Sequence, residues 1–344
     1  MADGLMTAVV APETVIAAIE ALDRPVVVGH VTPDADCLGS MLAVAKAWPA
    51  GDPRGARVCL PADSVSHRLQ FLVEWADLPV VGAEALALAD GFVVLDTAHK
   101  ARCNVGRQTP ENWSDGRCVV NIDHHQTNNG WGDHNWVVPG ASSSAELVYH
   151  AIRSANRPMT TLIASLLYAG LHSDTRGFTV VDPGGRALAV ATELVRAGAR
   201  AAEIGQCLYR GLRTSELELL RIIYANTRVT AGGLIAYSTA DHGEITGAGC
   251  RAEDIDEHVE VPRSVGGIAI AMLFTEGRLG RVRINFRAEP GYTVLPLAQR
   301  IGGGGHPQAA GAMLDCSLPE ALERVLPLAE RFVDDQSQQR WSTE

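Results

Sequence analysis

Runs of branched apolar residues alternate with segments of helical periodicity through the first half of the chain. The first run, 24–29, is short, continuous and bounded by proline and glycine, which is typical of a strand buried on both faces. The polar loop 30–40 separates it from the next helical segment. The pattern predicts an α/β fold with a mainly parallel, doubly wound sheet. The expected strands are 24–29, 58–60, 80–81, 91–95 and 118–120, and the expected helices are 13–22, 41–48, 66–75, 145–154 and 159–171.

The pattern changes after residue 184. Residues 185–230 have helical periodicity and few strand signals, which predicts a helical linker. Further along, two apolar runs and one strictly alternating run predict strands of a smaller α+β domain. These strands are 233–238, 265–274 and 280–287, followed by helices at 295–301 and 319–333. We therefore expect an α/β domain over 1–184, a linker over 185–230 and an α+β domain over 231–344.

Composition narrows the class of protein. The 344 residues are 47% hydrophobic, and no apolar run is long enough to span a bilayer, so membrane contact is not expected. The stretch 1–12 contains Asp3 and lacks the basic region of a secretory signal, and the seven cysteines are scattered. Both features favour a cytoplasmic protein with reduced thiols. The net charge of -11 disfavours binding to long nucleic acid but permits a small anionic substrate beside bound cations.

Side chains of the kind that bind metals gather at the ends of the predicted segments. Parallel strands bring their carboxyl ends to one edge of a sheet, so we expect these side chains to meet. So many carboxylates repel one another unless cations lie among them, and two metal ions are the simplest resolution. Carboxylates and imidazoles without thiolate suit Mn²⁺ or Mg²⁺ and also accept Zn²⁺ or Co²⁺. The residues are His30, Asp34, Asp36, Asp96, Asp123, His124, His125 and Asp174.

Each of these groups also has a purely structural interpretation. The loop 30–40 is compatible with helix capping by its aspartates, and residues 121–125 with a polar loop of solvated histidines. Side chains alternate faces along an extended backbone, so we expect His124 and His125 to diverge and only one of them to bind metal. A serine run at 142–144 predicts a helix N-cap, with phosphate contact as the alternative.

The ligand groups resemble the metal motifs of the DHH family of phosphoesterases, of the DHH–DHHA1 type. In chain order they are His30-Val-Thr-Pro-Asp-Ala-Asp-Cys-Leu-Gly-Ser40, Asp96-Thr97, Asp123-His-His125 and Asp174-Thr175. A fifth segment, Gly302-Gly-Gly-Gly-His-Pro-Gln-Ala-Ala-Gly311, is similar to the substrate-binding motif of the DHHA1 domain. The resemblance spans nearly the whole chain and points to the bacterial oligoribonuclease (nanoRNase) and phosphoadenosine-phosphate phosphatase group.

The resemblance implies two divalent metal ions, with Mn²⁺ as the first expectation and Mg²⁺ or Co²⁺ as alternatives. Asp96 would bridge the two ions, Asp123 would orient a ligand histidine or the family loop, and His125 would face the substrate phosphate or the leaving group. A water shared by the ions would then attack phosphorus as hydroxide. The implied ligand sets are His30, Asp34 and Asp96 for one ion, and Asp36, Asp96, His124 and Asp174 for the other.

In the second domain the resemblance implies a substrate site around the glycine run. The glycines alone could form only a flexible turn. Glycine also lets backbone N–H groups approach an anion closely, and a neighbouring histidine can donate a hydrogen bond. The implied substrate-binding residues are Gly304, Gly305, His306 and Arg287, with Arg263 and Ser264 as a second anion-binding pair.

The activity that the resemblance implies is hydrolysis of very short RNAs, including linear dinucleotides, from one end. Removal of the 3′-phosphate of 3′-phosphoadenosine 5′-phosphate is the second implied activity. The expected partners are short RNA and mononucleotide phosphates, without long duplex nucleic acid or membrane, and a homodimer is an open hypothesis. The alternatives are a cyclic-dinucleotide phosphodiesterase and, from another class, a nucleotide-binding regulator with a silent site. An inorganic pyrophosphatase agrees less well with the glycine-histidine signature.

Some residues near the motifs depart from the family pattern or have two interpretations. His172 and Arg176 flank the fourth motif, where family members often carry small or hydroxyl residues. Arg176 is expected either to contact the scissile phosphate or to pair with a carboxylate. Trp131 and Trp136 are expected to pack in the core or in a lid, with base stacking as the alternative.

Overall fold

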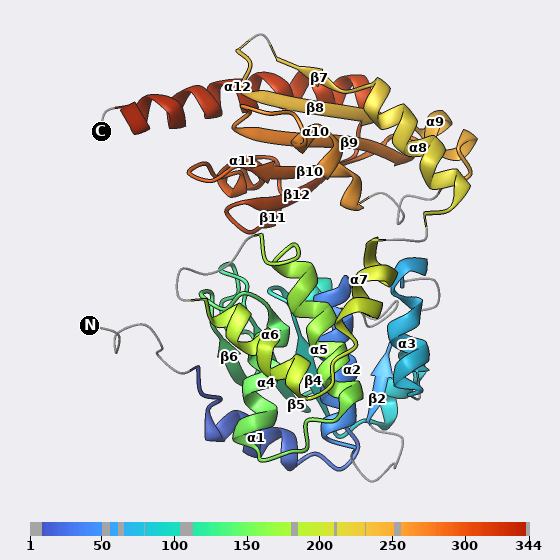
Figure 1. The fold of residues 1–344 in the computed structure, drawn as a ribbon, viewed down its shortest axis with the longest axis vertical. Helices are drawn as coiled ribbons and strands as arrows, with labels where there is room; N and C mark the ends of the chain where they lie inside the picture. Colours follow the sequence, from blue (N-terminus) through green and yellow to red (C-terminus); the bar gives the residue numbers. More distant parts are fainter. Residues whose placement is uncertain are drawn as a thin grey trace. The chain divides into compact units, whose positions relative to one another are not determined.

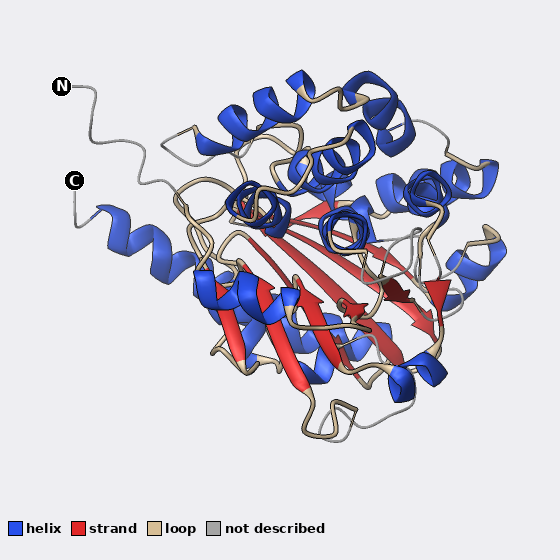
Figure 2. Cartoon of the chain, turned by 90° about the horizontal axis from the view of Figure 1, so that it is seen from below, coloured by secondary structure: helices blue, strands red, loops and turns tan. Residues whose placement is uncertain are grey.

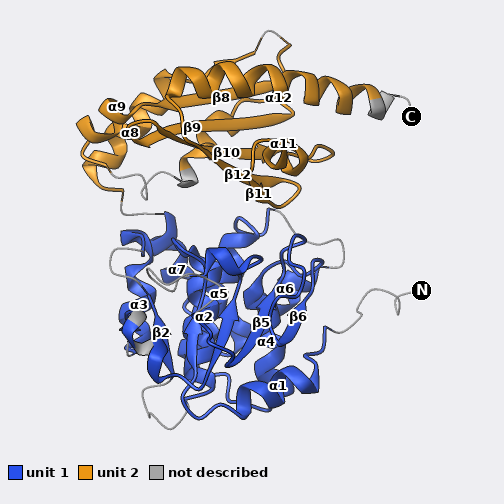
Figure 3. Cartoon of the chain, turned by 180° about the vertical axis from the view of Figure 1, so that it is seen from behind, with its two compact units in different colours: residues 1–211 blue, residues 212–344 orange. Residues whose placement is uncertain are grey.

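The chain divides into two units in the computed structural model (Figure 3). Unit 1 is Met1–Gly211 and unit 2 is Leu212–Glu344. Helices α6 (Arg186–Arg196) and α7 (Ala201–Tyr209) belong to unit 1, and α8 (Thr214–Ala225) belongs to unit 2. The residues that the structure describes are 9–49, 56–60, 65–78, 80–103, 113–179, 185–209, 212–230, 232–250 and 256–341.

Unit 1 is built on a six-stranded, all-parallel sheet in the order β3-β2-β1-β4-β5-β6 (Figure 1). This sheet confirms the predicted α/β fold class. The last strand was not predicted, because its four residues include polar His134 and Asn135 and give no apolar run. The strands are β1 (Val26–Val28), β2 (Arg57–Cys59), β3 (Val80–Val81), β4 (Gly91–Leu95), β5 (Cys118–Asp123) and β6 (His134–Val137).

The α-helices of unit 1 join the core on one face of this sheet. Val27 and Val93 point into that face. The opposite face carries Phe92 and is covered by the 3₁₀ helix η2 (Ala83–Leu88) and Trp113. Because both faces are covered, β1 and β4 are apolar at every position, as the runs predicted. The helices, blue beside the red strands in Figure 2, are α1 (Glu13–Glu20), α2 (Ala35–Ala47), α3 (Gln70–Ala76), α4 (Ser144–Ser154), α5 (Thr161–Asp174), α6 and α7.

Helix α2 begins earlier than the pattern predicted. We expected a polar loop up to residue 40 and a helix over 41–48, but α2 starts at Ala35. Asp34 is its N-cap, because Oδ1 of Asp34 accepts hydrogen bonds from the backbone N–H groups of Asp36 and Cys37, each at 3.0 Å. The capping alternative is thus correct for Asp34. Asp36 lies on the first turn of a buried helix rather than in a loop.

Two glycines allow α2 and α5 to pack closely. A Cβ atom added at Gly39 would lie 2.4 Å from the carbonyl oxygen of Leu166, and one added at Gly170 would lie 2.8 Å from Oδ1 of Asp36. Larger side chains at these positions would push the two helices apart. The close contact brings the start of α2 next to the last turns of α5, which ends at Asp174.

The strand order reverses between β1 and β4. From β1 the sheet continues through β2 and β3, and from β4 it continues through β5 and β6. In open parallel sheets, ligands bind beyond the carboxyl ends of the strands at such a reversal. His30 follows β1 and Asp96 follows β4, so both residues lie where this topology places a ligand.

Unit 2 contains a mixed six-stranded sheet in the order β11-β12-β10-β9-β8-β7, which agrees with the predicted α+β fold. Among the described strands of unit 2, only the β8–β9 pair is parallel. Phe274 and Phe286 face α11 and α12, whereas Leu273 faces α8, α9 and α10. The elements are β7 (Arg228–Val229), β8 (Ile235–Ala240), α9 (His242–Gly247), α10 (Glu260–Arg263), β9 (Ile270–Arg278), β10 (Arg281–Ala288), α11 (Leu295–Arg300), β11 (Gly304–Gly305), β12 (Ala309–Leu314) and α12 (Leu318–Trp341).

Two further observations concern the chain as a whole. No helix within the described residues has both the length and the apolar character needed to cross a membrane. The seven cysteines are free thiols, as their scattered spacing predicted.

Candidate active site

Three carboxylates surround the Nε2 atom of His124, just beyond the end of β5. This atom lies 3.2 Å from Oδ2 of Asp174, 3.4 Å from Oδ1 of Asp96 and 3.8 Å from Oδ2 of Asp36. Ligand atoms that share one ion at bond lengths of about 2.1 Å lie roughly 3 Å apart in octahedral geometry. The four residues predicted to bind the second ion are therefore gathered around one point.

The residues predicted to bind the first ion form a looser group around His30. Its Nε2 atom lies 3.5 Å from Oδ2 of Asp96 and 3.9 Å from Oδ2 of Asp34. The Asp34 side chain is 56% exposed, whereas that of Asp96 is 3% exposed. Asp96 thus presents Oδ2 toward His30 and Oδ1 toward His124, which is the arrangement that a bridging carboxylate needs.

Backbone carbonyl groups orient both of these imidazoles. His30 donates a hydrogen bond from Nδ1 to the carbonyl oxygen of Val31 at 2.8 Å, and His124 donates from Nδ1 to the carbonyl oxygen of Ala141 at 3.2 Å. A carbonyl oxygen only accepts, so the proton of each neutral ring lies on Nδ1. Each Nε2 then presents its lone pair to the carboxylates, as a metal-binding histidine does.

Asp96 has a left-handed backbone conformation, with φ of 53°. Its N–H group donates to the carbonyl oxygen of Ile122 at 3.0 Å, which ties the end of β4 to β5. Its Oδ1 atom accepts a hydrogen bond from Oγ of Ser144 at 3.0 Å. Residues in this conformation are uncommon and gather at functional sites, where the surrounding structure holds them.

The electrostatics of the site call for positive charge among the carboxylates. Burial, together with the charges of Asp96 and Asp174, raises the pKa of Asp36 well above its ordinary value. Burial opposes ionisation of Asp96, but the hydrogen bonds that His124 and His30 donate when their rings are protonated outweigh it and lower the Asp96 pKa. Burial likewise opposes the charged form of His124, but the surrounding carboxylates outweigh it and raise the His124 pKa. Oxygen and imidazole groups in such a field fit divalent ions of the Mn²⁺ and Mg²⁺ class.

A thiol that we did not predict in the site lies beside the first group. His30, Cys37 and Asp96 are buried and offer ligand atoms within 4.8 Å of one another. The Cys37 sulfur accepts a hydrogen bond from the backbone N–H group of His30 at 3.4 Å, and burial raises the pKa of the thiol to about 11. The sequence signal for this thiol is its spacing. Cys37 comes three residues after Asp34, and residues three apart are neighbours on a helix.

Asp123 orients the ring of His125. His125 donates a hydrogen bond from Nδ1 to Oδ1 of Asp123 at 2.7 Å, and the backbone N–H groups of His124 and His125 donate to the same oxygen. Oδ2 of Asp123 accepts from Nδ2 of Asn128 at 2.6 Å. Burial raises the Asp123 pKa, but the hydrogen bond and charge of His125 outweigh burial and lower it. An ionised Asp123 thus holds the Nδ1 proton of His125 in place.

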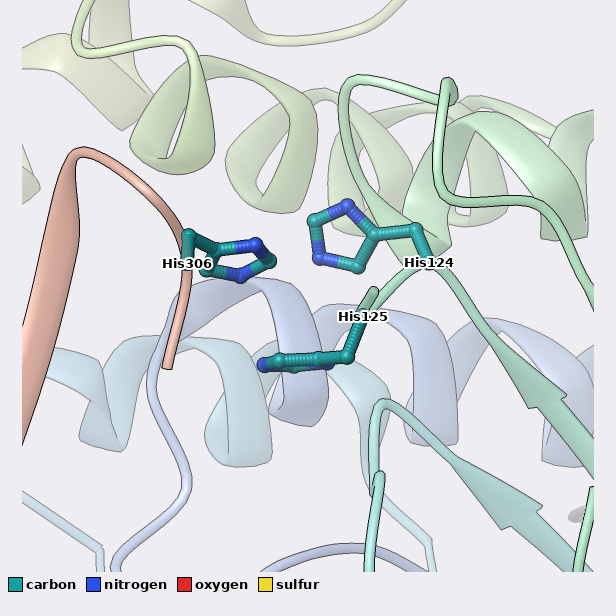
Figure 4. A group of neighbouring side chains, drawn as sticks. All are labelled: His124, His125 and His306. Carbon is teal, nitrogen blue, oxygen red and sulfur yellow. The ribbon is translucent and has the colours of Figure 1, made fainter. Parts of the chain in front are cut away.

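The expected divergence of the two histidines was wrong in its geometry. β5 ends at Asp123, so the alternation of an extended strand does not reach His124 and His125. Their ring centroids are 5.0 Å apart with an interplanar angle of 68°, and both rings turn toward one region (Figure 4). Nδ1 of His125 lies 3.5 Å from Oδ1 of Asp96, the oxygen that His124 also approaches. The two histidines differ in the groups that orient them rather than in direction.

The glycine motif of unit 2 forms a strand rather than a flexible turn. β11 consists of Gly304 and Gly305, which pair with Gly311 and Ala310 of β12. A Cβ atom added at Gly303 would lie 2.2 Å from the carbonyl oxygen of Gly311, whereas one added at Gly304 would have nothing within 4 Å. Gly303 is therefore needed for packing, and Gly304 leaves open space above its Cα atom. After the glycines, the N–H group of His306, a predicted substrate-binding residue, donates to a carbonyl oxygen of β12 at 2.8 Å.

The arginines predicted to bind anions in unit 2 gather around Glu260. Arg263 donates from Nε to Glu289 at 2.8 Å and from Nη1 to Glu260 at 3.2 Å. Nε of Arg287 lies 3.6 Å from Oε1 of Glu260. Ser264 donates its hydroxyl to a carbonyl oxygen of α10 at 2.7 Å. A bound anion would compete with Glu260 for both guanidinium groups.

The residues near the motifs, His172, Arg176 and the two tryptophans, occupy different environments. Nδ1 of His172 lies 3.3 Å from a tyrosine hydroxyl of α7, and burial lowers the His172 pKa. Arg176 has a left-handed backbone conformation, with φ of 50°. Trp136 is 6% exposed and belongs to the main core, as expected. Trp131 donates its indole N–H to the carbonyl oxygen of Thr97 at 3.1 Å, next to the second motif.

Comparison with known proteins finds matches in both parts of the chain. The models of the DHH family, N-terminal domain, and of the DHHA1 domain match residues 24–171 and 233–335. A bifunctional oligoribonuclease and PAP phosphatase from Thermus thermophilus is 32% identical over 319 residues, which cover 90% of each protein. One from Bacillus subtilis is 26% identical over 302 residues, which cover 87% of this chain and 92% of the relative.

A solved structure supports the fold. The crystal structure of an exopolyphosphatase-related protein from Bacteroides fragilis superposes with a TM-score of 0.81 at 22% sequence identity, and the match covers 96% of this chain and 100% of the other. The two family models fall within unit 1 and unit 2, respectively. The chain therefore belongs to the DHH family, with a DHHA1 domain in its second unit.

Proposed function

We propose that this protein is a metal-dependent hydrolase of short oligoribonucleotides, including linear dinucleotides, and of the 3′-phosphate of 3′-phosphoadenosine 5′-phosphate. The observation that carries the proposal is the convergence of Asp36, Asp96 and Asp174 on Nε2 of His124. Such a cluster suits a divalent ion, because carboxylates that are buried together are unfavourable without a cation among them. The two bacterial relatives named above carry both activities in their names.

The chain's own residues would prepare the reaction. His30 and Asp34 would hold one ion, while the group around His124 would hold the other, with Asp96 between them. When bound, two such ions make hydroxide available at neutral pH and neutralise charge on the phosphoryl oxygens. Asp123 keeps the proton of His125 on Nδ1, so Nε2 is the ring atom that faces the phosphate or the leaving oxygen.

Unit 2 would bind the nucleotide portion of the substrate. Gly304 supports this role, since the space above its Cα atom lets an anion approach the backbone. Gly305, His306 and Arg287 complete the proposed set, as the family motif implies. Arg263 and Ser264 receive less support, because their donor groups are already engaged by carboxylates and a carbonyl oxygen.

We further propose Mn²⁺ as the working ion, with Mg²⁺ or Co²⁺ as alternatives. The imidazole and carboxylate groups support this choice, because Mn²⁺ accepts both nitrogen and oxygen ligands. The cytoplasmic location remains a prediction from the sequence. The homodimer remains a hypothesis that light scattering of the purified chain would test.

The decisive experiment measures turnover of three substrates by the purified full-length chain with Mn²⁺. We expect hydrolysis of a linear diribonucleotide and of 3′-phosphoadenosine 5′-phosphate, and not of a cyclic dinucleotide. Hydrolysis of the cyclic dinucleotide alone would replace the proposed substrate class. If none of the three substrates is cleaved, the hypothesis of a nucleotide-binding regulator is favoured instead.

The matched variant for this experiment is Asp96→Asn. Asparagine has the size of aspartate and tolerates the left-handed conformation at this position, so the backbone is preserved. We expect turnover to fall by more than about 100-fold, since even groups outside the ligand shell cost 10- to 100-fold. Wild-type turnover in this variant would remove Asp96 from the metal centre.

A further inference from the structure

The segment 140–146, at the start of α4, contributes none of the predicted metal ligands but contacts three of them. The carbonyl oxygen of Ala141 accepts the Nδ1 proton of His124 at 3.2 Å. The N–H group of Ser144 donates to Oδ2 of Asp36 at 2.7 Å, and the N–H group of the next residue donates to Oδ1 at 2.9 Å. The hydroxyl of Ser144 donates to Oδ1 of Asp96 at 3.0 Å. We call this stretch the serine segment.

The start of α4 makes Asp36 an acceptor of helix N–H groups. Ser143 is the N-cap of α4, so Ser144 and the residue after it occupy the first two helical positions. Their N–H groups have no partner within the helix and carry partial positive charge. Each oxygen of the fully buried Asp36 accepts one of them, and one lone pair of Oδ2 remains for the region of His124.

The serine segment is itself held in place by an ion pair whose carboxylate is fully buried. Glu146 is fully buried and accepts hydrogen bonds from the N–H group and hydroxyl of Ser142 at 2.7 and 2.5 Å. Its other oxygen accepts from Nε of Arg186, at the start of α6, at 3.0 Å. A charge buried in this way is fixed by its partners, so the segment cannot shift without breaking several bonds.

The hydroxyl of Ser144 therefore orients the carboxylate of Asp96. It occupies one lone pair of Oδ1 of Asp96, and the remaining lone pair of this oxygen is the one that His124 approaches. Without the hydroxyl, the Asp96 carboxylate could rotate about its last torsion, because such torsions are broad. Oδ1 and Oδ2 of Asp96 would then no longer be fixed toward His124 and His30, respectively.

We propose that Ser144 is a positioning residue that sets the affinity of the centre for divalent ions by fixing Asp96 and, through its N–H group, Asp36. The inference rests on the proposed function, since it presupposes that ions bind between these residues. It extends the centre to a segment that carries no metal motif.

Two neighbouring serines provide the test. Ser143 and Ser144 are both fully buried, but the Ser143 hydroxyl caps α4 by accepting the N–H group of Glu146 at 3.0 Å. Mn²⁺ affinity is measured by electron paramagnetic resonance for the wild type, Ser144→Ala and Ser143→Ala, together with unfolding temperatures of the metal-free proteins. We expect Ser144→Ala to weaken Mn²⁺ binding by about 10- to 100-fold. Ser143→Ala should lower the unfolding temperature and leave the affinity unchanged.

The outcomes separate the two proposals. Failure of the wild type to bind Mn²⁺ contradicts the proposed metal centre, whereas wild-type affinity in Ser144→Ala overturns only the role of Ser144. An equal loss of affinity in Ser143→Ala also overturns it, because the loss would then reflect loosening of α4. If Ser144→Ala lowers the metal-free unfolding temperature, Ser144→Thr, which retains the hydroxyl, must restore the affinity for the proposal to stand.

Discussion

Asp123 acts on the candidate centre through the ring of His125. Replacing it with asparagine keeps its size but removes the charge that fixes the Nδ1 proton of His125. In the serine-protease triad the equivalent change costs about 10⁴ in turnover, because the histidine takes the wrong tautomer. We therefore expect Asp123→Asn to lower kcat by about 100-fold or more with little change in Mn²⁺ affinity. Steady-state kinetics beside a Mn²⁺ titration tests this, and an equal loss of affinity would make Asp123 a metal ligand.

His150 is expected to lower the stability of the folded protein at acidic pH. It lies on α4, its Nε2 atom is buried, and this atom has no hydrogen-bond partner within the described residues. Burial lowers the His150 pKa, with Glu146 raising it and Arg186 lowering it by smaller amounts. The folded protein then binds this proton less well than the unfolded chain. Stability is complete above the unfolded pKa of about 6.5 and falls as the pH drops through the lower folded pKa.

The corresponding variant is His150→Leu. We expect its free energy of unfolding to change less between pH 7.5 and pH 5 than that of the wild type, because the group that resists protonation is gone. Urea unfolding in the presence of a chelator at both pH values measures the difference. An identical pH dependence in the two proteins would show that other groups control the acid sensitivity.

At the scale of single elements, local signals predicted the strands of unit 1 except β6, and the ends that carry metal-type residues. Apolar runs are local, so β1, β4 and β5 appeared close to their true positions. The start of α2 was missed because polar Asp36 and small Gly39 and Ser40 obscure helical periodicity in a helix that is buried all round. β6 and β12 were missed because their residues are too polar or too small to resemble strands.

The contacts of the serine segment could not be predicted from one sequence. Its capping role was visible, because Ser143 and Glu146 have the spacing of an N-cap and an acidic first turn. Its bonds to Asp36 and Asp96 join residues 108 and 48 positions apart. Such pairs are created by the order of the strands and the packing of α2 on α5, and no local periodicity records them.

The glycine motif combines packing and binding at adjacent positions, and two alanine variants separate them. Gly303→Ala places a Cβ atom against β12, so we expect it to destabilise unit 2 by about 1–3 kcal/mol. Gly304→Ala meets open space, so stability should stay within about 1 kcal/mol of the wild type while nucleotide affinity falls. Chemical unfolding and calorimetric titration with a mononucleotide measure both quantities. If Gly304→Ala binds the nucleotide as the wild type does, the glycine run serves packing alone.

At the scale of the whole molecule, removal of metal should affect the two units unequally. All the predicted ligands lie in unit 1, so an ion at 100 times its dissociation constant would stabilise that unit by about 2.7 kcal/mol. We expect a chelator to increase hydrogen exchange in β1, β4 and β5 and to leave β9 and β10 unchanged. Mass spectrometry of peptides from each unit measures this. Equal loss of protection in unit 2 would mean that the ions stabilise the chain as one cooperative body.

The spread of the ligands along the chain has a consequence for biosynthesis. The group around His124 closes only when Asp174, at the end of α5, has packed beside Asp36 from the start of α2. A nascent chain that has emerged as far as α4 contains three of the four residues of this group, but it lacks the last carboxylate, Asp174. Ions are captured by folded sites rather than by unfolded chains. We therefore expect the identity of the bound ion to be decided after translation has passed residue 174, by the metals that the completed unit 1 encounters.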